Sequence, residues 1–230
     1  MIPEISVIIP AYNEESYVEN CLKTLDSQTF KNFETIVVDS GKDSTSSIAE
    51  KYGAFVIKQG KNGPAAARNA GAKIAKGRVF VFLDADCRVS SDFLSKIHKK
   101  FNRPIGGGIC QISVYDYERR SDAVLYEILN TAAKIFIMMR FIVTSGSCFV
   151  YSKEAFFKVG GFREDLMTNE DHDLARRVGR KARFEVFDDI VVETSSRRLK
   201  KLGPWKGALT CIKSASSYLL ADKGLKDYWD

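Results

Sequence analysis

The first hundred residues alternate short apolar runs with segments of helical spacing, and this alternation constrains the fold more than any other feature. The run ISVII is continuous, which is typical of a strand buried on both faces of a parallel sheet. The segments between the runs carry apolar residues three and four positions apart, as on one face of a helix. The predicted strands are Ile5–Ile9, Thr35–Val38, Ala54–Ile57 and Val79–Leu83. Such an order predicts an α/β fold with a mixed, mostly parallel sheet and helices on both faces.

After residue 100 the alternation is looser, although strand and helix patterns continue. The three glycines 106–108 predict a turn before an extended stretch. The further predicted elements are an extended Ile109–Tyr117, a helix from Asp122 to about Met139, a strand Ser147–Tyr151, and helices over Glu154–Val159, Glu170–Arg180 and Gly207–Leu220. Neither an internal repeat nor a linker-like stretch is visible, so we expect residues 1–230 to form a single domain.

Composition excludes several classes of protein. The chain is 45% hydrophobic and 28% charged, which is typical of a globular protein and not of a disordered one. Its longest apolar stretch, Ala132–Val143, is interrupted by two charges and falls short of the roughly 18 residues of a membrane helix. Glu4 precedes the first apolar run, so we predict no signal peptide and a cytoplasmic location. The five cysteines form no CxxC pair, which predicts buried thiols without a disulfide framework or zinc site.

The net charge of +6 comes from one part of the sequence. Between Arg176 and Lys206 ten Lys and Arg face four acids, which leaves 25 of each sign elsewhere. A solvated face is the ordinary explanation for such a segment. The functional explanations are an anionic membrane surface, a phosphate-bearing substrate or a nucleic acid, but no motif that reads DNA or RNA is visible, so we expect no nucleic acid partner.

Two carboxylates, Asp84 and Asp86, directly follow the apolar strand VFVFL. Two such charges at a strand end are costly unless a positive partner lies near, and a hard cation such as Mg²⁺ or Mn²⁺ takes oxygen ligands and keeps positions open for phosphates. A turn in which an aspartate caps a helix over Val89–Phe101 explains the same residues equally well. The sequence therefore leaves both a metal site and a structural turn open.

Other polar residues follow the first two predicted strands or begin predicted helices. The loop Pro10–Glu14 offers an aromatic ring and a carboxylate, as a nucleoside site does, and Asp39 is followed by a glycine turn. Arg68 interrupts an alanine-rich helix, either as a cation for these acids or as a surface arginine.

Asn169–Asp173 holds three carboxylates and His172 at a helix start, more acid than a cap requires. A carboxylate there would suit a general base. His98 and His172 are the only histidines, too few for a multi-histidine metal site.

Two common catalytic motifs are missing from the sequence. It contains no GxxxxGK[ST] phosphate loop, so phosphate binding would rest on a metal and arginine. It also lacks a GxSxG elbow, which counts against an α/β-type hydrolase.

Taken in order, the motifs resemble the family 2 glycosyltransferases of the GT-A fold. The resemblance covers about 85% of the chain, and only the series of motifs, not any single one, is specific. The segments that carry it are SVIIPAYNEE, TIVVDSGKDST, GPAAARNAG, FVFLDADC, GGFREDLMTNEDHDLARR and IVVETSSRR. It implies an enzyme that moves a sugar from a nucleotide-diphosphate donor to an acceptor hydroxyl with inversion at the anomeric carbon. It also implies residues 1–100 as the donor-binding half and 101–230 as the acceptor and base half.

The resemblance implies roles for individual residues of the donor half. The nucleoside-binding loop would be Pro10, Ala11, Tyr12 and Glu14, with Asp39 contacting the base. Asp86 would ligate Mn²⁺ or Mg²⁺, and Asp84 would contact the ribose or the metal shell. Arg68 would lie near the donor.

In the second half, Asp171 would take the proton from the acceptor and Glu170 would hold the acceptor or orient the base. Two departures from the family pattern stand out. Ser40 replaces the second of two adjacent acids, and Thr194 stands where many members carry a histidine ligand.

The acceptor is predicted only as a class, a glycan or a lipid-phosphate of the cell envelope or of glycoprotein synthesis. The apolar stretch Ile135–Val143 is a core element by default; if exposed, it would suit a lipid-linked acceptor and peripheral contact with an anionic membrane. Arg197 and Arg198, together with Lys200 and Lys201, would then lie near the acceptor or phosphate group. The alternatives are a nucleotidyltransferase, which would normally need a basic or glycine-rich triphosphate loop, and a catalytically silent nucleotide-sugar-binding protein.

Overall fold

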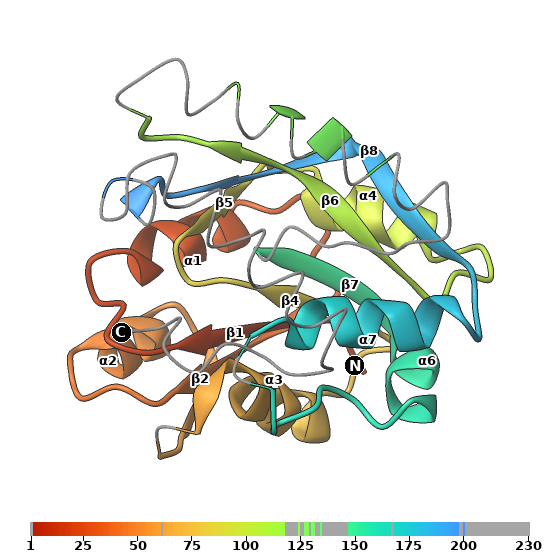
Figure 1. Ribbon diagram of the computed structural model, residues 1–230. Helices are drawn as coiled ribbons and strands as arrows, with labels where there is room; N and C mark the ends of the chain where they lie inside the picture. Colours follow the sequence, from red (N-terminus) through yellow and green to blue (C-terminus); the bar gives the residue numbers. More distant parts are fainter. Residues whose placement is uncertain are drawn as a thin grey trace.

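One eight-stranded sheet organises the chain, with the strand order β3-β2-β1-β4-β7-β6-β8-β5 (Figure 1). The structure, a computed structural model, describes residues 2–60, 62–117, 124, 127–128, 130–131, 134, 147–166, 168–197 and 200. The strands are β1 (Ile5–Ala11), β2 (Phe33–Asp39), β3 (Phe55–Lys58), β4 (Val79–Leu83), β5 (Cys87–Val89), β6 (Gly107–Val114), β7 (Cys148–Ser152) and β8 (Phe184–Thr194). All four strands predicted in the first hundred residues are present.

The sheet is parallel in its first half and mixed in its second. Strand β1 lies between β2 and β4 and is parallel to both, and β3 is parallel to β2. Strand β7 enters antiparallel between β4 and β6, and β5 pairs antiparallel with β8. Because β1, β2 and β4 run in the same direction, their carboxyl ends meet at one edge, where open α/β sheets bind ligands.

Helices cover both faces of the sheet and bury two apolar cores. On one face α1 (Val18–Asp26), α2 (Thr45–Lys51) and α4 (Phe93–Lys100) pack against alternate residues of β1 such as Val7. On the other face α3 (Gly63–Ile74), α6 (Lys153–Lys158) and α7 (Glu170–Gly179) pack on Ile8 and on the aromatic residues of β4 and β7. A strand enclosed on both faces is mostly apolar, which explains the run at the start of the sequence; the one polar residue of this run, Ser6, donates its hydroxyl hydrogen to Glu34.

Three predictions need correction or lie outside the described chain. Gly107 and Gly108 begin β6 instead of forming a turn. Glycine is needed at both positions because aromatic rings pack against the strand: a Cβ on Gly107 would lie 2.6 Å from the Tyr151 ring, and a Cβ on Gly108 would lie 2.5 Å from the Phe187 ring. The alternative helix over 89–101 begins only at Phe93, because residues 87–89 pair with β8 as strand β5. The described positions between 124 and 134 are helical, as expected, whereas 135–143 and 207–220 lie outside the described residues.

The predicted burial of the cysteines is confirmed for four of the five. Cys21, Cys87, Cys110 and Cys148 are buried free thiols, and Cys211 lies outside the described residues. In the described part of the chain, no helix combines the length and apolarity needed to cross a membrane.

Candidate functional site

The motif residues converge on the carboxyl edge of the sheet. In the parallel register Pro10 lies beside Val38 and Ala11 beside Asp39, so the loops that leave β1 and β2 begin side by side. Strand β4 ends at Leu83, directly before Asp84. The short loops after three neighbouring strands therefore bring the motifs PAYNE, DSG and DAD together.

Hydrogen bonds connect the loop after β1 to the loop after β2. Asn13 adopts a left-handed backbone with φ 56°, and its side-chain oxygen accepts a hydrogen bond from the backbone N–H of Lys42 at 3.0 Å. Gly41 approaches so closely that an added Cβ would lie 2.5 Å from the Asn13 nitrogen. The Tyr12 side chain, 48% exposed, lies at the surface of this joined loop pair. The arrangement leaves an aromatic ring accessible where the sequence predicts nucleoside binding.

Asp39 is buried beneath the loop pair. Its carboxylate accepts hydrogen bonds from the Gly41 backbone N–H at 2.7 Å, the Ser46 hydroxyl at 2.6 Å and the Lys58 ammonium at 2.7 Å. Burial raises the pKa of Asp39, but these hydrogen bonds outweigh it and hold the pKa below its ordinary value. A contact between Asp39 and a base, as the sequence predicts, would require one of these partners to move.

Arg68 joins the first half of the chain to the second. Its guanidinium donates to Asp84 Oδ1 at 3.0 Å and to Glu170 Oε1 at 2.6 Å, and only 4% of the side chain is exposed. The rings of Phe149 and Phe162 lie 5.3 and 5.6 Å from its Cζ atom. Arg68 is thus a buried cation between two of the predicted site acids and not a surface arginine.

The acids Glu170 and Asp171 begin α7, where the helix dipole favours negative charge. The preceding Asn169 has φ 63°, a left-handed turn that aims the first helical turn at Arg68. Burial raises the pKa of Glu170 to about 7, although the charge of Arg68 acts in the opposite direction. Asp171 and Asp173 are also buried, and Asp173 pairs with Arg177 at 2.7 Å.

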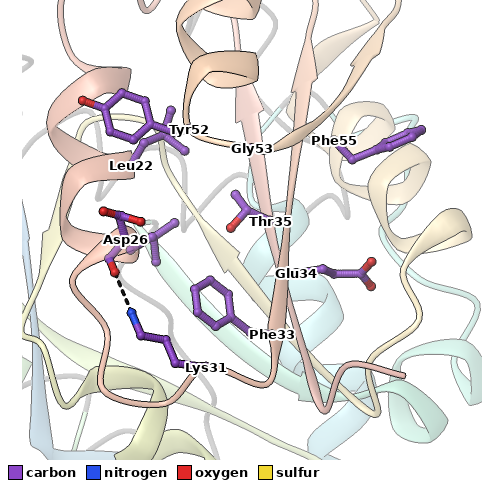
Figure 2. Close-up of a pocket in the computed structure, with 10 residues that line it drawn as sticks. Leu22, Asp26, Lys31, Phe33, Glu34, Thr35, Tyr52, Gly53 and Phe55 are labelled. Atoms are coloured by element: carbon purple, nitrogen blue, oxygen red, sulfur yellow. Dashed lines mark hydrogen bonds between the residues drawn. The ribbon is translucent and has the colours of Figure 1, made fainter. Parts of the chain in front are cut away.

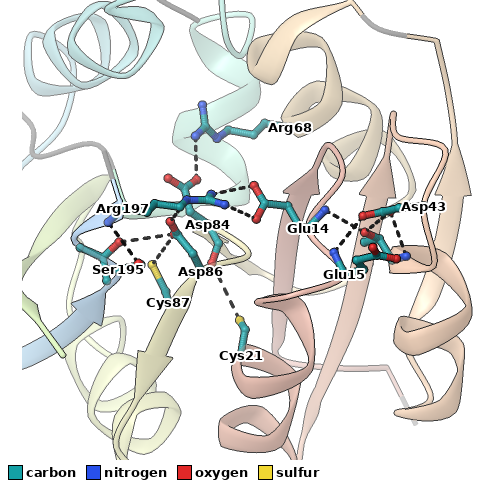
Figure 3. A network of polar contacts seen from close by, with 12 residues as sticks. Glu14, Glu15, Cys21, Asp43, Arg68, Asp84, Asp86, Cys87, Ser195 and Arg197 are labelled. Carbon is teal, nitrogen blue, oxygen red and sulfur yellow. Dashed lines mark hydrogen bonds and ion pairs between the residues drawn. The ribbon is translucent and has the colours of Figure 1, made fainter. Parts of the chain in front are cut away.

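Arg197 lies between Glu14 and Asp86 (Figure 3). Its two Nη atoms each donate to one oxygen of Glu14 at 2.7 Å, and its Nε atom lies 2.9 Å from Asp86 Oδ2. The Thr194 hydroxyl lies 3.4 Å from the other oxygen of Asp86. The sequence predicts Arg197 for the acceptor or phosphate, and the structure places it against the predicted donor loop; Arg198 lies outside the described residues.

Asp116 is a positioning residue that the sequence analysis did not identify. It accepts hydrogen bonds from the Ser195 hydroxyl at 2.8 Å and from the Ser196 backbone N–H, and Lys200 lies 3.7 Å away. These contacts fix the segment that carries Arg197. Asp116 lies just after the end of β6, and Asp39 is the last residue of β2, so an acid at a strand end was the signal that could have identified Asp116.

The carboxylates at this edge have the chemistry to hold a hard divalent cation. Burial raises the pKa of Glu14 most, and the charges of Asp86 and Asp84 raise it further, so three acids repel one another here. No three His, Cys, Asp or Glu side chains of the described chain form a metal site by themselves. However, Mg²⁺ is usually held by one or two carboxylates with water and substrate phosphates. Asp86 already binds a cationic side chain through a hard carboxylate oxygen. The carboxylates of this edge therefore fit a divalent metal whose other ligands come from a bound diphosphate.

The basic segment does not form one uncompensated surface in the described chain. Arg177 pairs with Asp173, Arg183 with Glu185, Arg197 with Glu14 and Asp86, and Lys200 with Asp116. These four basic residues are therefore balanced by acids, which differs from the solvated face that the sequence suggested for the segment 176–206.

A cavity of about 400 Å³ lies at the opposite end of β2 (Figure 2). Strand β3 pairs with Ile36–Asp39, and the cavity opens beside the earlier residues Phe33–Thr35. Lys31 donates to the Asp26 carbonyl at its rim. Since Asp39 and the residues paired with it mark the other end of the strand, this cavity is separate from the candidate site.

Comparison with known protein families identifies one match. The family described as glycosyl transferase family 2 matches residues 6–160. The uncharacterized glycosyltransferase EpsJ of Bacillus subtilis is 39% identical over 103 residues, which are 42% of this chain and 30% of EpsJ. The chain therefore aligns with less than a third of that relative.

A longer alignment and a solved structure extend the comparison. The GalNAc(5)-diNAcBac-PP-undecaprenol beta-1,3-glucosyltransferase of Campylobacter jejuni is 30% identical over 183 residues, 74% of this chain and 58% of that protein. The mannosyltransferase PcManGT of Pyrobaculum calidifontis, solved with GDP-Man and Mn²⁺, superposes with a TM-score of 0.70 at 20% identity, over 96% of this chain and 71% of PcManGT. This likeness confirms the predicted GT-A fold.

Proposed function

The chain belongs to glycosyltransferase family 2, and from this membership we propose that it transfers a sugar from a nucleotide-diphosphate donor to an acceptor hydroxyl. The observation that carries the proposal is the convergence of Asp84 and Glu170 on Arg68, at 3.0 and 2.6 Å. A donor site at the strand ends and a base at a helix start must adjoin for direct transfer, and Arg68 joins them.

Residues 1–100 would bind the donor. Pro10, Ala11, Tyr12 and Glu14 line the loop for the nucleoside, with the exposed Tyr12 ring available to the base. Asp86 and Asp84 would hold Mn²⁺ or Mg²⁺; the structure of PcManGT in complex with GDP-Man and Mn²⁺ supports this. Asp39 would act on the base only after releasing Lys58 or Ser46, so its first role here is to hold the loop after β2.

Residues 101–230 would bind the acceptor and accept its proton. Asp171 takes the proton from the acceptor hydroxyl, the hydroxyl oxygen bonds to the anomeric carbon, and the bond from that carbon to the diphosphate breaks on the opposite face, with inversion. Glu170 and Arg68 position Asp171 relative to the donor, since all three meet at the start of α7. The bound metal would supply positive charge to the departing diphosphate.

The acceptor we propose is a hydroxyl of a lipid-linked or polysaccharide glycan of the cell envelope or of glycoprotein synthesis. The name of the Campylobacter jejuni relative, which includes an undecaprenol-linked glycan, supports this class. Sedimentation of the chain with anionic vesicles at low salt tests peripheral membrane contact. Unchanged sedimentation would argue against a membrane-held acceptor and in favour of a free glycan.

The donor site is tested by a thermal-shift panel of UDP, GDP, CDP and dTDP, with and without Mn²⁺. We expect one nucleotide to raise the melting temperature in a Mn²⁺-dependent way, because ligands that bind only the folded state stabilise it. Asp86→Ala should lose the shift, whereas Asp26→Ala, at the opposite end of the sheet, should keep it. A shift that survives Asp86→Ala would contradict the proposed donor site. Once the nucleotide is identified, transfer to an acceptor is measured as release of that nucleoside diphosphate.

A further inference from the structure

Arg197 occupies the position where the candidate site would need to receive a cation. Both oxygens of Glu14 accept hydrogen bonds from its Nη atoms, and its Nε atom forms an ion pair with Asp86 Oδ2 at 2.9 Å. Glu14 and Arg197 are 183 positions apart in the sequence, so the contact closes the end of β8 onto the first loop of the fold. Figure 3 shows the guanidinium lying between the two carboxylates.

The backbone beside Arg197 is held firmly, while its side chain is not enclosed. Asp116 fixes Ser195 and Ser196 through their hydroxyl and backbone groups. The guanidinium lies 4.5 Å from the centre of the Tyr17 ring, and 39% of the Arg197 side chain is exposed. A fixed backbone and an accessible side chain allow the guanidinium to change partners by rotation of the side chain alone.

Arg197 and a divalent cation would compete for Oδ2 of Asp86 in this arrangement. Mg²⁺ binds carboxylate oxygens at about 2.1 Å, which is shorter than the 2.9 Å to the Arg197 nitrogen. Both cations would then lie on the same oxygen and repel each other at short range. The second oxygen of Asp86 faces the neutral hydroxyl of Thr194, which brings no competing charge.

We propose that Arg197 is a built-in counter-cation, which neutralises Glu14 and Asp86 in the donor-free chain and is displaced to the diphosphate when a divalent cation binds Asp86. The proposal rests on the proposed function, because it assumes a nucleoside diphosphate as the ligand. Arginine suits both positions, since its planar fork pairs with carboxylates and with phosphates. Arg197 thereby competes with the metal for Asp86 and strengthens the binding of the diphosphate.

The two roles predict effects of opposite sign for Arg197→Ala. Titration with Mn²⁺ alone, followed by the electron paramagnetic resonance signal of free Mn²⁺, should show affinity rising at least about threefold, because the competing cation is gone. With saturating Mn²⁺, the affinity for the nucleoside diphosphate found in the thermal-shift panel should fall at least about tenfold, as expected for a lost charged phosphate contact. Arg197→Lys, which keeps the charge without the fork, should lie between the wild type and Arg197→Ala in both measurements.

Controls separate this proposal from damage to the fold. Arg103→Ala removes an exposed arginine whose nearest acid is Glu185, 3.5 Å away, and should leave both affinities unchanged. If Arg197→Ala folds poorly, Arg197→Gln removes the charge with a smaller loss of packing and carries the same expectations. Unchanged or weaker Mn²⁺ binding by the neutral variants, absence of Mn²⁺ binding in every protein, or unchanged nucleotide affinity would each overturn the proposal. Failure of the wild type to transfer sugar would instead count against the proposed function and leave the Mn²⁺ result standing.

Discussion

The Nη1 atom of Arg68 lies 2.6 Å from Glu170 Oε1, and this contact joins side chains 102 positions apart. Arg68 leaves the buried face of α3, and Glu170 opens α7. The same guanidinium donates to Asp84, at the end of β4. Burial lowers the pKa of Arg68, but the charges of Asp84, Glu170 and Asp171 outweigh it and raise the pKa, so Arg68 stays cationic.

Removing Arg68 should destabilise the fold strongly. Arg68→Ala leaves Asp84 and Glu170 without their shared cation, and breaking a buried ion pair from one side costs about 3–5 kcal/mol. Urea denaturation measures the free energy of unfolding. The exposed pair Lys23–Glu19 provides the control, since Lys23→Ala should leave that free energy nearly unchanged. Equal effects of the two substitutions would contradict the role assigned to Arg68.

Glu170 should make stability depend on pH between about 4.5 and 7. Burial raises its pKa in the folded chain to about 7, above the value of 4.5 expected when unfolded. In that window the folded state keeps a proton that the unfolded state has released, so the free energy of unfolding falls as pH rises. Glu170→Gln removes this dependence. Urea denaturation at pH 5, 6, 7 and 8 should show a smaller decline in the free energy of unfolding for the variant than for the wild type. Parallel profiles would contradict the raised pKa of Glu170.

Gly71 allows α3 to approach β1 and thereby places Arg68. A Cβ at Gly71 would lie 2.5 Å from Cγ2 of Ile8 and 3.2 Å from Cγ2 of Val38. Although alanine favours helix formation, Gly71→Ala should lower the free energy of unfolding by about 1–3 kcal/mol, the usual cost of overpacking. Gly60→Ala is the matched control, because nothing lies within 4 Å of the added Cβ. A stabilising Gly71→Ala would show that the helix can shift without cost.

The fold of the first half was predictable because its signals are local. Each buried parallel strand appears as an apolar run, and each acid that follows one, such as Asp84, lies at the shared carboxyl edge. Strand β5 was not predicted, since three residues are too few to display a period. The glycines before Ile109 suggested a turn because the sequence does not show the rings that require them.

The candidate site was predictable as a set of acids but not as a network. Arg68 was expected near the donor acids, and the structure adds that it is buried and also bound to Glu170. No spacing rule connects Arg197 to Glu14, because tertiary packing alone brings positions 183 apart into contact. The roles assigned to the site residues remain predictions, and the variants described here test them.

Asp171→Asn should abolish transfer while preserving donor binding. The amide cannot accept the acceptor proton, and loss of a general base lowers the rate by a factor of about 10² to 10⁴. Binding of the nucleoside diphosphate with Mn²⁺ should be unchanged, because Asp84, Asp86 and Glu14 are untouched. Asp173→Asn is the control in the same helical turn: it removes a buried carboxylate that pairs with Arg177, so it should lower stability while the folded variant keeps its transfer. If Asp171→Asn keeps its transfer rate, Asp171 is not the base; if both variants lose transfer equally, the helix start and not one carboxylate is required.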